Sequence, residues 1–248
     1  MVRPLGETQS DIFKLYYQRF PVAFRFGSFH ALLRATTIKH LVNKLYSDSK
    51  FTHQTYERLN RTRSVLRQII WYGVDSEQGR QSIAHMNRSH QNLNVSNEDY
   101  CYILGLFFLE PLRWNRCFDQ NKMQSQAIQA IIDFWVSIGE RMHINIAMRD
   151  YAQWQHFQQS YENEFLCASE YAHQLAIQTL QETPRMSVPI GFRYWVKQAL
   201  LATADPIVLD CLALPHSRFR GHWMVQLLDK GRMITVNTRL QPPKELHS

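Results

Sequence analysis

The chain has 248 residues, of which 45% are hydrophobic and 20% are charged. This length and composition are typical of a globular protein with one sizeable core, and they argue against intrinsic disorder. The formal net charge is +7, but the basic residues are spread along the chain without a run of five. This spread argues against nucleic-acid binding, whereas a basic surface is compatible with peripheral contact with membrane headgroups.

The four cysteines and the N-terminal residues bear on the compartment. No two cysteines form a Cys-x-x-Cys pair, so neither a zinc site nor a disulfide framework is expected. The first ten residues lack the apolar core of a signal peptide, and the longest apolar stretch, residues 100–109, is too short to span a bilayer. We therefore expect a cytoplasmic protein. The cysteines are Cys101, Cys117, Cys167 and Cys211.

Hydrophobic residues recur with the helical period along the whole chain, and no alternating strand pattern stands out. Ser96 followed by Asp99 is a helix start signal, and prolines divide the C-terminal third. No repeat or linker divides the chain, so we predict one all-α domain over residues 1–248, a multi-helix bundle. The predicted helices are 8–19, 28–47, 53–72, 76–93, 97–117, 122–144, 149–165, 167–182, 190–203 and 216–236.

The helix predicted at 53–72 carries polar groups on or near its apolar face. At ~100° per residue, Thr62 falls close to the centre of the stripe that contains Val65 and Ile69. Arg58 lies about 50° from this centre, and Arg61 lies at the edge of the stripe. Thr62 could simply bond to a carbonyl four residues back, and Arg58 could pair with an internal acid. A bound carboxylate would satisfy both side chains at once.

The next predicted helix, 76–93, places His90 within its apolar stripe and His85 on the opposite side. His90 could be a core histidine bonded to a carbonyl, or an axial iron ligand. Haem b offers an iron to an inward imidazole and carboxylates to an inward arginine, and the sequence therefore predicts a haem-b pocket inside the bundle. The stripe consists of Gly79, Ile83, Met86, Asn87, His90 and Leu93.

The helix at 97–117 is apolar on nearly every side and contains Glu110 directly before Pro111. The proline is expected to kink the helix. Glu110 could pair with a core arginine such as Arg113, or it could handle protons beside a reactive centre.

Two Glu-x-x-His pairs, Glu140/His143 and Glu170/His173, suggest a di-iron site of the kind found in four-helix bundles. The helical phase disfavours this interpretation, because Glu140 lies about 120° from the centre of its stripe and the second pair points away from its own. Serine-hydrolase, phosphate-loop, dinucleotide and zinc-protease motifs are missing from the sequence.

An ordered series of motifs over about residues 50–243 resembles the rubber oxygenases, the haem-b latex-clearing proteins. It is most similar to the branch that includes the mycophenolic-acid-pathway oxygenase. The motifs are Arg58-x-x-x-Thr62, residues 86–90 (MNRSH), 95–99 (VSNED), 110–114 (EPLRW), 134–144 (FWxxIGxxMxI), 212–215 (LALP) and Pro242-Pro243.

The resemblance implies an all-helical fold around one haem b, with His90 as the axial ligand and Arg58 and Thr62 beside the cofactor. It also assigns Arg61 to the position where rubber oxygenases carry a lysine that can approach the iron. Because arginine is bulkier and stays charged, Arg61 need not repeat the role of that lysine.

The function expected from these residues is a haem-b oxygenase that uses dioxygen on an apolar, unsaturated, isoprenoid-like substrate. A haem carrier or sensor without turnover is the first alternative. A di-iron protein or a metal-free helical binding protein is the second.

Overall fold

The computed structural model describes residues 10–46, 51–91, 93–187, 190–219, 223, 225–226 and 243, without the side chains of 44–46, 51–60, 183–187 and 190. The predicted all-α class is confirmed, because the described residues form helices and a single isolated β-bridge between Ile38 and Leu166. In the described part of the chain, no helix combines the length and apolar character needed to cross a bilayer.

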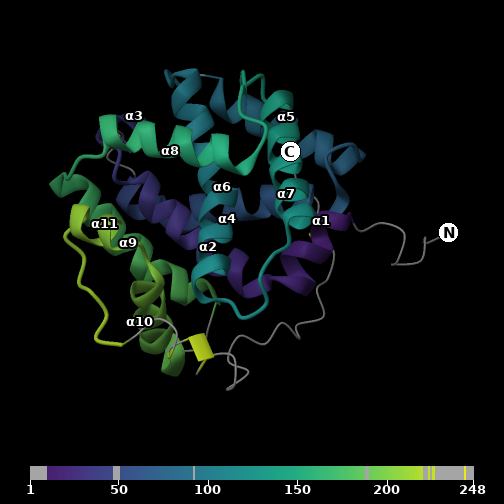
Figure 1. Ribbon diagram of the computed structural model, residues 1–248. Helices are drawn as coiled ribbons and strands as arrows, with labels where there is room; N and C mark the ends of the chain where they lie inside the picture. Colours follow the sequence, from purple (N-terminus) through teal and green to yellow (C-terminus); the bar gives the residue numbers. More distant parts are fainter. Residues whose placement is uncertain are drawn as a thin grey trace.

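The helices follow one another with short connections (Figure 1). Two short elements are not α-helices: η1 is a π-helical turn and η2 is a 3₁₀ turn. In chain order the elements are α1 (Asp11–Lys14), η1 (Leu15–Arg19), α2 (Pro21–Ala35), α3 (Lys39–Tyr46), α4 (Phe51–Tyr72), α5 (Glu77–His90), α6 (Asn97–Phe118), α7 (Ser125–Arg141), α8 (Tyr151–Phe165), α9 (Glu170–Ser187), η2 (Ile190–Phe192), α10 (Arg193–Thr203) and α11 (Pro206–Cys211).

Helix α6 lies at the centre of the molecule, as expected for a helix that is apolar on nearly every side (Figure 1). It packs most extensively against α2. Gly27 of α2 makes this close approach possible, since a Cβ atom there would lie 2.3 Å from the Cα of Pro111 on α6. On another side of α6, the rings of Phe108 and Trp154 meet edge to face at 5.1 Å, which brings α8 onto the central helix.

The start of α6 is fixed by a capping box, as the sequence predicts. The Ser96 side chain accepts a hydrogen bond from the Asp99 backbone N–H, and the Asp99 carboxylate accepts one from the Ser96 N–H. The start of α5 is capped in the same manner by Ser76. Gly73 precedes it with a φ of +85°, a conformation that other residues adopt at a cost, and the chain turns there from α4 into α5.

The predicted helix 28–47 is wrong, because two helices occupy this region. The first begins earlier, with Pro21 at a position where proline suits a helix start. It ends where the hydroxyls of Thr36 and Thr37 donate to the carbonyls of Leu33 and Arg34, each at 2.7 Å. These short-range bonds compete with the helical pattern and separate α2 from α3.

The C-terminal third also differs from the prediction. Helix α11 was not predicted, although Asp205 caps it by accepting from the Ile207 N–H and Pro206 occupies its first turn. The predicted helix 216–236 lies largely outside the described residues.

Candidate functional site

A cavity of about 330 Å³ opens beside the C-terminal end of α5. This volume lies at the lower end of the range of about 300–1,000 Å³ that small-molecule sites occupy. Its walls come from three places: the last turn of α5, the first turn of α6, and the segment that follows α7. The lining residues are Asn87, Arg88, His90, Gln91, Asn97, Tyr100, Met142, His143 and Ile144.

His90 is the last residue of α5 and contributes its half-buried imidazole to this cavity. Its Nδ1 is buried, and neither ring nitrogen hydrogen-bonds to any residue that the structure describes. Burial lowers the pKa of His90, so the ring is neutral at neutral pH and retains a lone pair. The ring of Tyr100 covers it, with 6.0 Å between the ring centroids. Since an unpaired buried polar atom costs roughly 1–3 kcal/mol, this imidazole is well placed to serve a ligand.

Two asparagines hold the cavity walls together. The Asn87 side chain donates a hydrogen bond of 3.0 Å to the carbonyl of Arg141, which ties α5 to the end of α7. The Asn97 side chain donates to the carbonyl of Asn145 at 2.9 Å and accepts from its N–H at 2.8 Å. These bonds join the end of α7 to α5 and the segment after α7 to α6, which are the three walls of the cavity.

A second histidine, His143, lines the same cavity. It has a φ of +63°, the left-handed conformation that most often belongs to glycine just after a helix. The His143 N–H bonds to the carbonyl of Glu140 at 3.0 Å, and the Ile144 N–H bonds to that of Gly139 at 2.9 Å. This pair of bonds is the Schellman ending of a helix, and it turns the His143 side chain toward the cavity.

The two Glu-x-x-His pairs serve other purposes. Glu140 pairs with Arg149 at 2.7 Å, and the Nδ1–H of His173 donates to the carbonyl of Leu212 at 2.7 Å. Within the described residues, no three His, Cys, Asp or Glu side chains gather where they could hold a bare metal ion together.

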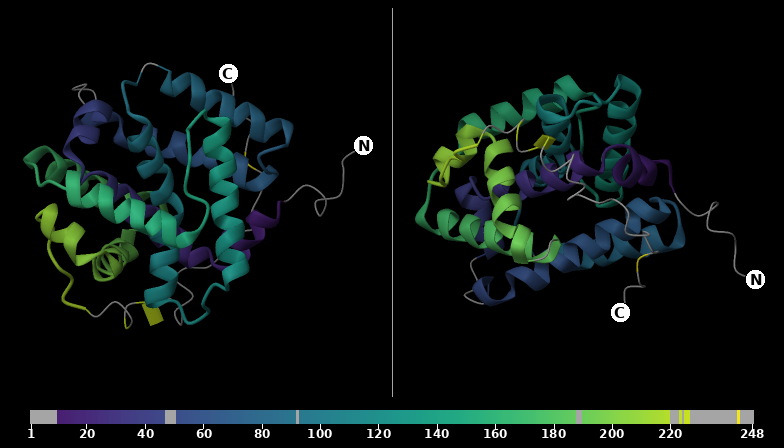
Figure 2. Two further views of the ribbon diagram at one scale, coloured as in Figure 1. Left: turned by 45° about the horizontal axis from the view of Figure 1, so that its top comes forward. Right: turned by 90° about the horizontal axis from the view of Figure 1, so that it is seen from below.

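The residues predicted on α4 do not line the cavity. Arg61 and Thr62 are both exposed, so the predicted inward position of Thr62 is wrong. Among residues 61–72 of α4, whose side chains the structure describes, burial begins at Val65, and Val65 and Ile69 of the predicted stripe are buried. Arg58 belongs to α4, and its side chain lies outside the described residues. Helix α4 packs side by side with α5, the helix that carries His90 at its C-terminal end (Figure 2).

A separate cluster of buried charges surrounds Arg34 of α2. Its guanidinium lies 2.6 Å from Glu110 of α6 and 2.9 Å from Glu162 of α8, and it also contacts Asp205 before α11. Arg113 adds a second cation to Glu110 at 3.0 Å. Burial alone would raise the pKa of Glu110, but Arg34 and Arg113 outweigh it and hold that pKa below its usual value. The predicted pairing of Glu110 with Arg113 is confirmed, and Glu110 is ionised rather than poised to give up a proton.

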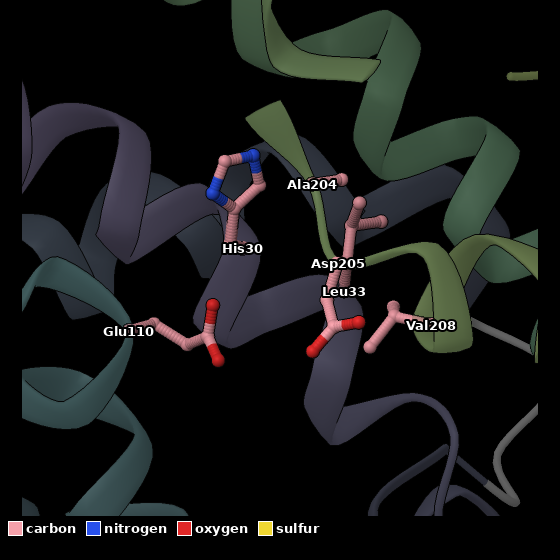
Figure 3. Close-up of a pocket in the computed structure, with 6 residues that line it drawn as sticks. All are labelled: His30, Leu33, Glu110, Ala204, Asp205 and Val208. Carbon is pink, nitrogen blue, oxygen red and sulfur yellow. The ribbon is translucent and has the colours of Figure 1, made fainter. Parts of the chain in front are cut away.

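The pocket between Glu110 and Asp205 is drawn in Figure 3, with His30 above it. It has no space for a water molecule. The Nε2–H of His30 donates to the carbonyl of Leu200 at 3.0 Å, and burial lowers the pKa of His30 to about 4. We interpret this cluster as a set of ion pairs that holds four segments together, and not as a ligand site. Sequence reasoning missed Arg34, whose signal was a lone arginine between the apolar residues Leu33 and Ala35.

Comparison with known proteins gives distant relatives. No protein-family model matches the chain. The chain is 25% identical over 198 residues to a protein of Penicillium brevicompactum named ER-bound oxygenase mpaB′. The aligned residues make up 71% of this chain and 47% of that protein. It is 26% identical over 133 residues to ER-bound oxygenase mpaB of the same fungus, covering 51% of this chain and 34% of that protein.

A third relative, ER-bound oxygenase mpaB of Penicillium roqueforti, is 24% identical over 198 residues, covering 71% of this chain and 66% of that protein. The chain spans about half the length of the first of these curated relatives. The similarity supports an oxygenase-like family of this branch. The wider link to the rubber oxygenases stays a prediction.

Proposed function

We propose that this chain is an oxygenase that binds haem b, with His90 as the protein ligand of the iron. The observation that carries the proposal is the His90 imidazole, which borders a cavity while neither of its nitrogens bonds to a described residue. The names of the distant relatives support the oxygenase part of the proposal. Histidine is a common protein ligand of haem iron, and haem needs only one such side chain.

The side chains that line the cavity include the chemical groups that bind haem in proteins. A neutral His90 ring can ligate the iron, and Arg88, which lines the same cavity, offers a cation to a carboxylate. From the resemblance in the sequence, Arg58 would also bind a carboxylate of the cofactor, whereas Arg61 and Thr62 are exposed and do not line the cavity. When bound, haem supplies the activation of dioxygen that side chains alone do not provide.

The surrounding residues would define where an apolar substrate lies. Met142, Ile144 and the ring of Tyr100 give the cavity apolar walls. Asn87 and Asn97 keep these walls in place through the hydrogen bonds described above. We propose an unsaturated, isoprenoid-like substrate, whose C=C bond would be split by one O₂ into two carbonyl groups, with one oxygen atom in each.

Binding of haem is tested by titrating haemin into the purified chain and recording the Soret absorbance. We expect a saturable band for the wild type and at least about tenfold weaker binding for His90→Ala. His85→Ala is the matched control, because His85 lies on the same helix but does not line the cavity. Equal binding by all three proteins, with unchanged circular dichroism, would refute the role of His90.

Turnover is tested separately on the haem-loaded protein. Reduced protein is mixed with O₂ and a polyunsaturated isoprenoid, and products are analysed by mass spectrometry with ¹⁸O₂. Carbonyl products that carry the label support the oxygenase. Stable haem binding without products supports the carrier or sensor.

A further inference from the structure

Four aromatic rings form a continuous strip over α10 and the segment that follows α11. The ring centroids of Tyr194 and Trp195 are 5.6 Å apart, those of Trp195 and Phe219 are 5.8 Å apart, and those of Phe219 and Trp223 are 5.6 Å apart. We call these four residues the aromatic strip. Tyr194 is 57% exposed and Trp223 is 50% exposed, and the neighbouring Phe192 is 43% exposed.

Helix α10, which carries Tyr194 and Trp195, is itself packed against the rest of the protein. The C-terminal half of α10 is packed, because Ala199, Leu200 and Leu201 are buried and α10 packs on α2 and α9. The aromatic strip therefore begins on a helix that is already anchored in the core. Large rings that cluster on an outer surface mark an interaction site far more often than isolated apolar residues do.

Basic residues accompany the aromatic strip along the chain. Residues 191–204 and 212–226 contain four basic residues and no acidic one. Of the two acids between these segments, Asp205 contacts the buried Arg34, and the exposed Asp210 lies 2.7 Å from His216. Lys197 follows Trp195 on α10 and the exposed Arg218 directly precedes Phe219, so this surface combines exposed rings with positive charge. The basic residues are Arg193, Lys197, Arg218 and Arg220.

We propose that the aromatic strip is a docking surface for a bilayer that contains anionic lipids. Tyrosine and tryptophan favour the depth of the lipid headgroups, because an apolar ring there can keep its polar atom in contact with water. Each basic residue near an anionic bilayer adds about 1 kcal/mol of attraction. The contact is peripheral.

The test is co-sedimentation of the full-length chain with vesicles of phosphatidylcholine, with and without about 30% phosphatidylserine. We expect binding to the anionic vesicles, a blue shift of tryptophan emission, and weaker binding as salt screens the basic residues. The double variant Tyr194→Ser/Trp223→Ser should bind at least about tenfold less. Ile207→Ser is the matched control, since Ile207 is 61% exposed but lies on α11 and outside the aromatic strip.

Charge is tested by Lys197→Gln/Arg218→Gln, which should reduce binding to anionic vesicles and leave the ring contacts in place. Circular dichroism shows whether each variant is folded. The proposal is refuted if the wild type does not bind vesicles, or if the double variant binds as well as the Ile207→Ser control. It is also refuted if light scattering shows a dimer that the double variant dissociates, because the strip would then contact a second copy of the chain.

Discussion

The buried cluster around Arg34 gives the sharpest test of the structure. Replacing Arg34 with methionine keeps much of the volume but removes the cation that contacts three carboxylates. Glu110 then stays buried, with a side chain that is 2% exposed, and retains Arg113 as its partner. Removing one partner of a buried ion pair costs about 3–5 kcal/mol, because the remaining charge is uncompensated. Since whole proteins are stable by about 5–15 kcal/mol, this loss is a large fraction of the total.

The effect of Arg34→Met should depend on pH. In the wild type the pKa of Glu110 lies below its ordinary 4.5, so its ionised form contributes stability above that pH and loses it as the pH falls through the lowered pKa. In the variant only Arg113 remains to oppose the rise in the Glu110 pKa that burial causes. Protonation of Glu110 then removes the uncompensated charge. The difference in unfolding free energy should therefore be largest at neutral pH and should shrink as the pH falls toward and below 4.5.

The measurement is urea unfolding followed by far-UV circular dichroism at several pH values. Arg149→Met is the control, because Arg149 and Glu140 form a pair whose side chains are 61% and 50% exposed. Such a surface pair contributes about 0–1 kcal/mol. If Arg34→Met costs no more than this control, or costs the same at every pH, the cluster does not stabilise the fold as we describe.

Two backbone predictions follow from the same coordinates. His143→Gly should stabilise the chain by roughly 1 kcal/mol in thermal unfolding, because glycine adopts the left-handed conformation without the side-chain clash, and a lower melting temperature would contradict this. Gly27→Ala should destabilise it by about 1–3 kcal/mol, since the new methyl group would meet the backbone of Pro111. Gly191→Ala, with no atom within 4 Å of the added carbon, should leave the melting temperature unchanged, and equal effects of the two substitutions would refute the close approach of α2 and α6.

The helical architecture could be predicted from the sequence wherever local signals agree. The helix predicted at 97–117 occurs as Asn97–Phe118, because a capping residue and continuous apolar character mark it. The division of 28–47 could not be predicted, because it depends on side chains that bond back to the chain and on a bridge from Ile38 to Leu166, more than a hundred residues away. Helix α11 had a usable signal in Asp205 before Pro206, which we interpreted as a break.

The candidate site was predictable in part. Helical phase correctly assigned His90 to the inner side of α5, but it could not show the second wall, which comes from residues 142–144. Phase failed for Thr62, because the period of a helix says which residues share a face and not how far along the helix the core extends. The partners of Arg34 lie 76 to 171 residues away in the chain, so no local pattern could identify them.

Two imidazoles in the described structure have a buried Nδ1 without a hydrogen-bond partner, and they show why burial alone does not identify a ligand site. His30 is the more deeply buried, yet its Nε2–H is held by the carbonyl of Leu200 and the adjoining pocket has no space for a water molecule. A ligand there would also meet the cations Arg34 and Arg113. His90 keeps both ring nitrogens free of bonds to described residues and borders 330 Å³ of space. An inward histidine therefore becomes a candidate ligand only where the surrounding helices leave room, and in this chain that room lies where α5, α6 and the segment after α7 meet.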